Sequence, residues 1–205
     1  MMYITKNEYP FREHISCFEN RKYVFIIAVN NKIKTMITFK FNKQKSIEAV
    51  LYLISKSGRN SYDLYKIVKM IFEADKYHLN RYMRPVTGDH FVSMKNGIVP
   101  SKIYDLCKNE DPKAPFFKKS PRLVRANRLA DGDYLSDSDK EALDWAFEQL
   151  DPLTFGQICE KNHAENPAWG RNYIEDSSKR IPFDQLIDDP ELIKELKDIS
   201  HRMVI

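Results

Sequence analysis

Residues 64–106 read LYKIVKMIFEADKYHLNRYMRPVTGDHFVSMKNGIVPSKIYDL, and this stretch decides the fold of the chain. Its first part predicts a long amphipathic helix, because apolar residues recur every three or four positions. Pro85 and Gly88 close that helix. Residues 91–94 and 98–99 then predict a short β-hairpin, and a further helix follows it. The apolar stripe of the long helix consists of Leu64, Ile67, Val68, Ile71, Phe72 and Leu79.

Asp75 lies on this stripe, where the period calls for an apolar residue. A buried carboxylate must be paired or hydrogen-bonded, so we expect Asp75 to cap a backbone turn or to pair with a basic side chain. A second interpretation is chemical. Asp75 and His78 stand three residues apart on the helix, and Asp89 and His90 follow the turn, so the four could assemble a metal or acid–base site.

The rest of the chain predicts further helices and one strand. Residues 109–121 are rich in Pro, Asn and Asp and indicate a loop, and residues 123–129 indicate a strand. Ser136 with Asp139, and Thr154 with Gln157, have the spacing of capping boxes. The fold class is therefore α+β, mainly helical. The expected helix starts outside the central stretch are Ser46, Ser136, Thr154 and Asp189, and the helix after the hairpin starts at Pro100.

The N-terminal part differs in character from the rest. Residues 23–29 and 33–41 are β-rich runs joined by two asparagines, which predicts a β-hairpin. A lone hairpin is not stable in water, so this one packs on the main domain, pairs with another chain or covers a partner. We divide the chain into an N-terminal hairpin extension, residues 1–45, and a main domain, residues 46–205. Homo-oligomerisation through the hairpin stays open.

Composition narrows the class of protein. Three widely spaced cysteines in 205 residues indicate free thiols in a reducing compartment. No run approaches the roughly 20 apolar residues of a membrane span, and the first residues carry no apolar signal segment. We therefore expect a cytoplasmic protein that does not enter a membrane. The net charge of +4, with no concentrated basic stripe, argues against nucleic acid as a partner.

Catalytic signatures are missing from the sequence, and a protein-binding composition is present. There is no GxSxG, phosphate-binding loop, dinucleotide fingerprint or HExxH, so we expect neither an enzyme nor a cofactor or metal site. Tyrosines mixed with arginines around the central helix are typical of protein-binding surfaces. His163 and Trp169 are expected to pair in a structural role. The candidate binding residues are Tyr65, Tyr77, Arg81, Tyr82, Arg84 and Tyr104.

Several ordered blocks together carry a resemblance to a known family. They are EADK at 73–76, GD at 88–89, GIVP at 97–100, IYD at 103–105, LS at 135–136, LD at 143–144, His163 with PAW at 167–169, and IP at 181–182. Over roughly residues 46–195 the chain resembles the Panacea domain family, the SocA-like antitoxins of toxin–antitoxin pairs. Ile98 departs from that pattern, which has proline there. The first 45 residues lie outside the resemblance.

The resemblance implies an antitoxin that neutralises a cognate toxin by direct protein contact. Some relatives act as adaptors that deliver the toxin to a protease, which is an alternative mechanism. A metal-dependent hydrolase and a DNA-binding autorepressor are alternatives of another class. The family supplies no catalytic residues, and its motif positions are expected to determine the fold. These positions are Asp75, Gly88, Asp89, Gly97, Pro100, His163 and Trp169.

Overall fold

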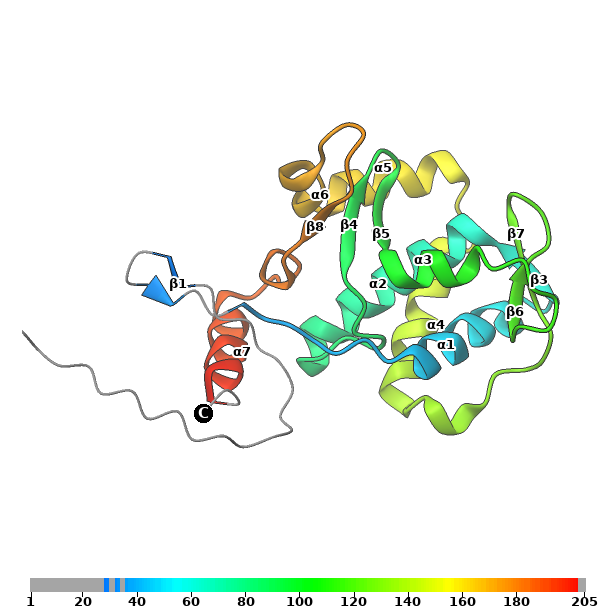
Figure 1. The fold of residues 1–205 in the computed structure, drawn as a ribbon, viewed down its shortest axis with the longest axis horizontal. Helices are drawn as coiled ribbons and strands as arrows, with labels where there is room; N and C mark the ends of the chain where they lie inside the picture. The colour runs from blue at the N-terminus through cyan, green and yellow to red at the C-terminus, as the bar shows by residue number, and fades with distance from the viewer. Residues whose placement is uncertain (1–27, 30–31, 34–35, 203–205) are drawn as a thin grey trace, which may run out of the picture.

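The structure is a computed structural model that describes residues 28–29, 32–33 and 36–202 (Figure 1). The fold is α+β and mainly helical, as predicted. The helices are α1 (Lys43–Lys56), α2 (Leu64–Tyr82), α3 (Ser101–Cys107), α4 (Asp137–Leu150), α5 (Phe155–Glu165), α6 (Pro167–Asn172) and α7 (Pro190–Arg202), with short 3-10 helices η1 (Gly132–Tyr134) and η2 (Phe183–Gln185). The strands are β1 (Ala28–Val29), β2 (Lys32–Ile33), β3 (Ser61–Asp63), β4 (Phe91–Met94), β5 (Gly97–Pro100), β6 (Phe116–Lys118), β7 (Leu123–Ala126) and β8 (Lys179–Ile181).

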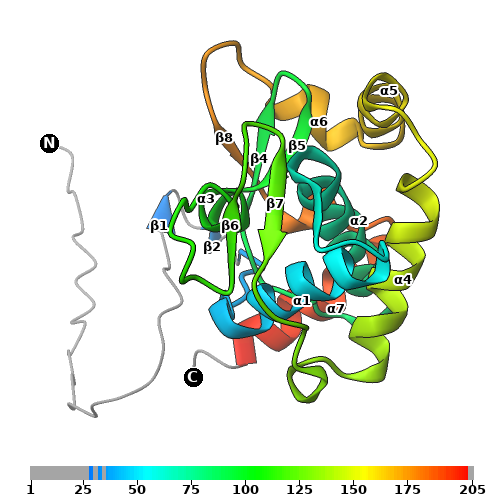
Figure 2. The ribbon, with the colours of Figure 1, turned by 90° about the vertical axis from the view of Figure 1, so that its right-hand side faces the viewer.

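Helix α2 is the central element, as its apolar stripe predicts. It lies between the β4–β5 hairpin on one side and α4 on the other (Figure 2). Its N-cap is Asp63, whose carboxylate accepts a hydrogen bond of 2.9 Å from the Lys66 amide. Its C-cap, Met83, takes the left-handed conformation with φ of 59°. The helix therefore ends at Tyr82, three residues before Pro85 and within one turn of the predicted end.

Two of the predicted helix starts are confirmed. Ser136 with Asp139 and Thr154 with Gln157 both form capping boxes. Helix α1 begins earlier than expected, because Asn42 accepts a hydrogen bond from the Lys45 amide and serves as the N-cap. Ser46, the expected cap, instead lies inside this helix.

Two three-stranded antiparallel sheets flank the helices. The predicted hairpin forms with Phe91 opposite Pro100 and Met94 opposite Gly97, and β8 adds to its other side in the order β5-β4-β8. The second sheet has the order β3-β7-β6. Strand β6 lies within residues 109–121, which were expected to form only a loop. Strand β8 was also missed, because only three residues form it and two of them are exposed.

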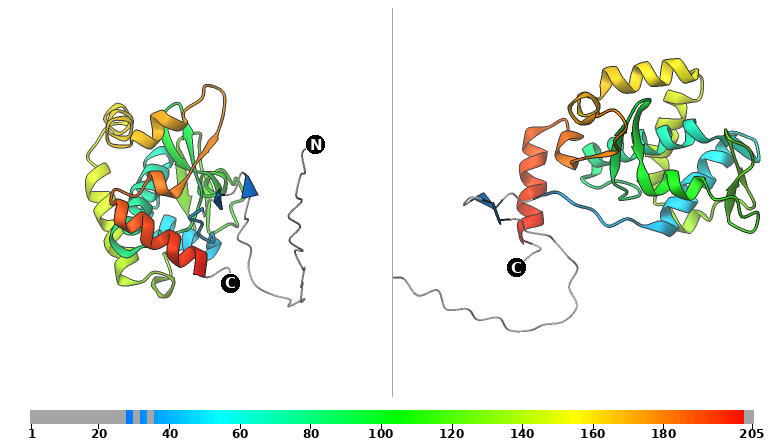
Figure 3. Two further views of the ribbon diagram at one scale, coloured as in Figure 1. Left: turned by 90° about the vertical axis from the view of Figure 1, so that its left-hand side faces the viewer. Right: turned by 45° about the horizontal axis from the view of Figure 1, so that its top comes forward.

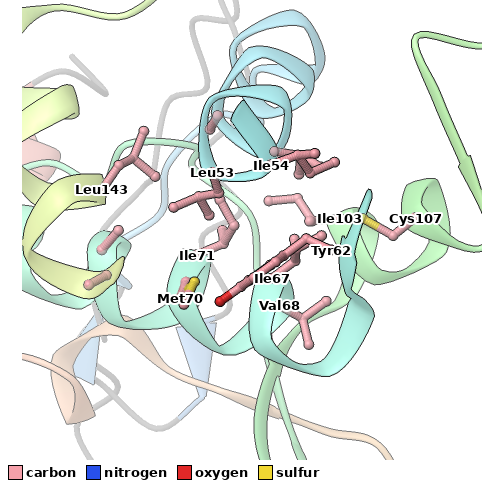
Figure 4. Close-up of a cluster of buried hydrophobic side chains, with 14 of the residues drawn as sticks. Leu53, Ile54, Tyr62, Ile67, Val68, Met70, Ile71, Ile103, Cys107 and Leu143 are labelled. Atoms are coloured by element: carbon pink, nitrogen blue, oxygen red, sulfur yellow. The ribbon is translucent and has the colours of Figure 1, made fainter. Parts of the chain in front are cut away.

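Two hydrophobic clusters make up the core. The first lies between α1, α2, α3 and α4, and Figure 4 shows side chains from these helices and from β3 pointing into it. The second lies between the other face of α2, the β4–β5 hairpin, η2 and α7. Helix α2 contributes side chains to both, for example Ile71 to the first and Phe72 to the second. The two clusters together explain why the stripe on α2 is wide.

Residues 36–42 were expected to continue a strand through residue 41, and this is wrong. Strand β2 ends at Ile33, and none of residues 36–42 is in a strand. They begin beside α7 and run from there to the start of α1 (Figures 1 and 3). Ile37 is buried in the second cluster, and the ring of Phe39 meets Phe183 edge-to-face at 4.9 Å. The Asn42 amide donates to the Thr87 carbonyl at 2.9 Å, so this segment is hydrogen-bonded to the main domain.

Of the predicted hairpin, β1 and β2 pair antiparallel, with Ala28 opposite Ile33. Residues 23–27 lie outside the described residues. The division of the chain at residue 45 stays a prediction. Among the described helices, none combines the length and the apolar character that crossing a bilayer requires.

Candidate protein-binding site

The six candidate binding residues fall at two ends of α2. Tyr77, Arg81 and Tyr82 meet α4, where the Tyr77 hydroxyl donates to Glu141 Oε1 at 2.8 Å and the Tyr82 hydroxyl donates to Glu141 Oε2. The Arg81 Nε atom lies 3.3 Å from Glu141 Oε1. Arg84 pairs with Asp139 of the same helix. These four side chains thus hold α2 against α4, an arrangement that the sequence did not reveal because Glu141 is distant along the chain.

A buried polar network lies behind this contact. His78 Nδ1 is 2.6 Å from the Arg84 carbonyl, and its Nε2 is 3.0 Å from the Ser138 hydroxyl. Burial lowers the pKa of His78, so the ring is neutral near pH 7. Burial opposes the ionisation of Asp139, but hydrogen bonds from Lys45 and Ser136 outweigh this effect and lower the pKa of Asp139. The Lys45 ammonium lies 2.6 Å from Asp139 Oδ2.

Asp75 and Asp89 both cap backbone, as expected for Asp75. The Asp75 carboxylate accepts from the amide of Thr87 at 2.8 Å and from its hydroxyl. Burial raises the pKa of Asp75 to about 7. Asp89 accepts from the amide of Ile103 at 2.9 Å, and so caps α3 from a position 14 residues away.

The four residues of the proposed metal or acid–base site therefore do not converge. Asp75 is bound to Thr87, His78 lies in the network with Arg84, and Asp89 binds backbone amides, including that of His90. Among the described residues, no group of three or more His, Cys, Asp or Glu side chains could hold a metal ion. The geometry gives this alternative no support.

Side chains from α2 and α5 fix the hairpin turn. The Lys69 ammonium donates to the Ile98 carbonyl at 2.6 Å, and Asn162 Oδ1 accepts from the Ile98 amide at 2.7 Å. Gly97 has φ of +101°, and a Cβ atom there would overlap Asn162 Oδ1 and lie 2.7 Å from Lys69 Nζ. Burial lowers the pKa of Lys69 to about 7. Neither Lys69 nor Asn162 was among the sequence-based candidates, since no local pattern marks a lysine as buried.

His163 and Trp169 form the pair that was predicted. Their rings stack with centroids 3.6 Å apart and an interplanar angle of 15°. The Trp169 indole donates to the Met94 carbonyl at 2.8 Å, and the Ser93 hydroxyl donates to the Trp169 carbonyl at 2.9 Å. The pair thus joins α5 and α6 to β4, which is a structural role.

Tyr65 and Tyr104, the other two candidates, line a groove of about 520 Å³ at the N-terminal end of α2. We call it the Tyr65 groove, lined by Tyr65, Tyr104, Phe155 and three basic side chains, Lys66, Lys95 and Arg122. The rings of Tyr65 and Phe155 lie 4.3 Å apart, and the Tyr65 hydroxyl donates to the Asn96 carbonyl at 3.0 Å. Phe155 is 54% exposed. Phe155 was not among the sequence-based candidates, because only the capping box on either side of it, Thr154 with Gln157, was recognised.

A second, smaller hollow of about 350 Å³ adjoins the groove. Asp63 and Lys66 line both cavities. The remaining walls of the second are polar and come from Ser57, Arg59, Ser61, Tyr62 and Asp151, beside Leu123. We call it the polar hollow. An aromatic groove and a polar hollow thus lie side by side at one end of α2, which suits the recognition of a protein segment.

Comparison with protein families gives a match to the family described as "Antitoxin SocA-like, Panacea domain" over residues 67–170. That range is slightly more than half of the chain and runs from α2 into α6. It is shorter than the resemblance predicted from the sequence, which covered roughly 46–195. No curated protein and no solved structure matches the chain.

Proposed function

Because the chain belongs to the SocA-like antitoxin, Panacea domain family, we propose that it neutralises a cognate toxin by direct protein–protein contact. The family match over residues 67–170 is the observation that carries this proposal. It covers most of α2, the hairpin, α4 and the stacked pair of His163 and Trp169. An antitoxin role also suggests a protein that acts by binding and not by catalysis.

The arrangement of polar side chains supports binding over chemistry. The buried carboxylates of Asp75 and Asp89 are engaged by backbone amides, and Asp139 is held by Lys45 and Arg84. Each group therefore already has a structural partner. Three aromatic and three basic side chains line the Tyr65 groove instead, and this composition favours a protein partner.

The mechanism that we propose is occlusion, in which the bound antitoxin covers the toxin's active surface. Delivery of the toxin to a protease remains the alternative mechanism. The proposal includes a cytoplasmic location, where such a toxin would act. Self-association through the N-terminal hairpin stays a prediction.

The test is co-expression with the product of the adjacent gene, scored by growth. The proposal expects the neighbour alone to stop growth and this chain to restore it. The abundance of the neighbour, followed after synthesis is stopped, separates the mechanisms: occlusion leaves its half-life unchanged or longer, whereas delivery to a protease shortens it. A neighbour that is harmless, or that remains toxic in the presence of this chain, would contradict the proposal.

A further inference from the structure

Strand β3 is an edge strand with unpaired backbone groups. Within the described residues it pairs with β7 and with no other strand. The Ala126 amide donates to the Asn60 carbonyl at 2.9 Å, and the Leu64 amide donates to the Arg122 carbonyl at 2.7 Å. The even-numbered residues of this segment therefore face β7. Because the backbone groups of successive residues in a strand point to opposite sides, those of Ser61 and the amide of Asp63 face away from β7.

The polar hollow lies at this free edge, since Ser61, Tyr62 and Asp63 all line it. Free strand edges are sites where an extended segment of another chain can add as a further strand. Asp63 also lines the Tyr65 groove, so a segment that pairs with β3 lies next to this groove. The edge supplies backbone hydrogen bonds, and the groove supplies a place for a side chain.

The aromatic groove is suited to one large apolar side chain. Its volume of about 520 Å³ lies within the usual range for binding pockets, and its walls include the rings of Tyr65, Tyr104 and Phe155. The Tyr65 hydroxyl is already bonded to the Asn96 carbonyl and its ring packs against Phe155, so the ring is held in place before binding. A rigid aromatic wall limits the entropy lost when a partner binds.

The charges around the two cavities favour an acidic partner. Four basic side chains line them, and the two acidic ones are engaged within the chain. Asp63 caps α2, and the Asp151 carboxylate accepts from the Tyr62 hydroxyl. In the described part of the chain, Arg59, Lys95 and Arg122 have no carboxylate within 4.0 Å. These three basic side chains are therefore available to an incoming carboxylate, whereas Lys66 donates to the Asp151 carbonyl.

We propose that an extended acidic segment of the partner protein adds to the free edge of β3 and inserts an aromatic or aliphatic side chain into the Tyr65 groove. Its carboxylates meet Arg59 in the polar hollow and Arg122 at the groove. This binding mode rests on the proposed function, because it describes how this chain would hold its toxin. It locates the contact at the N-terminal end of α2, away from the Tyr77–Glu141 contact at the other end.

A peptide selection tests the binding mode without the toxin. A phage-displayed library of random twelve-residue peptides is selected on the immobilised full chain. We expect enriched sequences that place Asp or Glu within three residues of an aromatic or aliphatic residue. Binding of a synthetic peptide from this set should slow hydrogen exchange at the amides of Ser61 and Asp63. Enrichment of basic peptides, no enrichment, or unchanged exchange at both amides would overturn the proposal.

Matched variants locate the contact. Arg122→Glu and Phe155→Asp should each weaken the selected peptide by about ten-fold or more. Arg171→Glu on α6 and Tyr134→Asp on η1 are the controls: Arg171 is exposed, and Tyr134 is 48% exposed, close to the 54% of Phe155. The controls should bind the peptide as the unmodified chain does. Equal losses in the groove variants and in the controls would contradict the location.

The growth assay separates the two proposals. If the unmodified chain restores growth and both groove variants restore it equally well, the groove inference fails while the proposed function stands. If the unmodified chain does not restore growth, the proposed function fails, and the peptide selection still decides what the groove binds. Binding of single-stranded oligonucleotide in place of acidic peptide would overturn the assignment of a protein segment.

Discussion

Gly88→Ala tests how the segment before α1 is attached to the main domain. Gly88 has φ of +70°, and a Cβ atom there would overlap the Lys40 carbonyl oxygen and lie 2.9 Å from its carbon. These are backbone atoms, so a side-chain rotation cannot relieve the contact. Residues 36–42 must shift, and the hydrogen bond from the Asn42 amide to the Thr87 carbonyl is at risk.

The expected loss of stability has three parts. A left-handed φ costs a residue with a Cβ atom about 1 kcal/mol. The hydrogen bond contributes about 1 kcal/mol. Partial exposure of Ile37 and Phe39, which pack in the second cluster, adds about 1–2 kcal/mol. We therefore expect Gly88→Ala to lower the free energy of unfolding by about 3–4 kcal/mol.

Gly58→Ala is the matched control. Gly58 also has φ of +70°, but no atom lies within 4 Å of its added Cβ. Both substitutions change the unfolded chain in the same way, so that contribution cancels in the comparison. Urea unfolding of both variants measures the difference. Equal destabilisation, within about 0.5 kcal/mol, would refute the packing of residues 36–42 across Gly88.

Three further predictions concern the buried polar contacts. Burial lowers the pKa of Lys69 to about 7 in the native state, below its value in the unfolded chain, so the native state binds fewer protons than the unfolded state. The free energy of unfolding should therefore rise from pH 7 to 9. The urea midpoint of Lys69→Met should rise less over the same range than that of the unmodified chain. Asp139→Asn removes the carboxylate paired with Lys45 and should lower the free energy of unfolding by about 2–4 kcal/mol at pH 7, measured by thermal unfolding. The effect should be smaller below pH 4, because the stabilisation that comes from the lowered pKa of Asp139 is lost there. Trp169→Phe keeps an aromatic ring but loses the hydrogen bond to the Met94 carbonyl, and urea unfolding should show a loss of about 1 kcal/mol.

The features that the sequence predicted are those with a local cause. The stripe on α2 follows from a helical period, and the capping boxes at Ser136 and Thr154 follow from a three-residue spacing. The buried position of Asp75 required a polar partner, and Thr87 supplies it 12 residues away. In each case the interacting residues lie close together in the chain, so a residue pattern is sufficient to predict the feature.

The features that it missed depend on residues far apart in the chain. Strand β8 forms because residues 179–181 pair with β4. These three residues are mostly exposed, and they show no sequence pattern that predicts the pairing. Tyr77 and Tyr82 were candidate binding residues, yet Glu141 on α4 accepts both hydroxyls. Periodicity shows which residues leave the core side of a helix, but it does not show what packs against the other side.

The candidate site also combines residues that the sequence predicted with residues that it missed. Tyr65 and Tyr104 were chosen from composition, and the structure places both at one groove. Phe155 and Arg122 come from segments elsewhere in the sequence, and only the fold brings them to the start of α2. Whether these residues contact a partner stays a prediction.

The central claim is direct binding of a toxin, and affinity capture tests it most directly. The product of the adjacent gene is tagged, co-expressed with this chain and purified, and the complex is weighed by light scattering. The account predicts a stoichiometric complex of the two chains, with the toxin intact and growth restored. Restored growth with no complex, at any salt concentration in the purification, would contradict it.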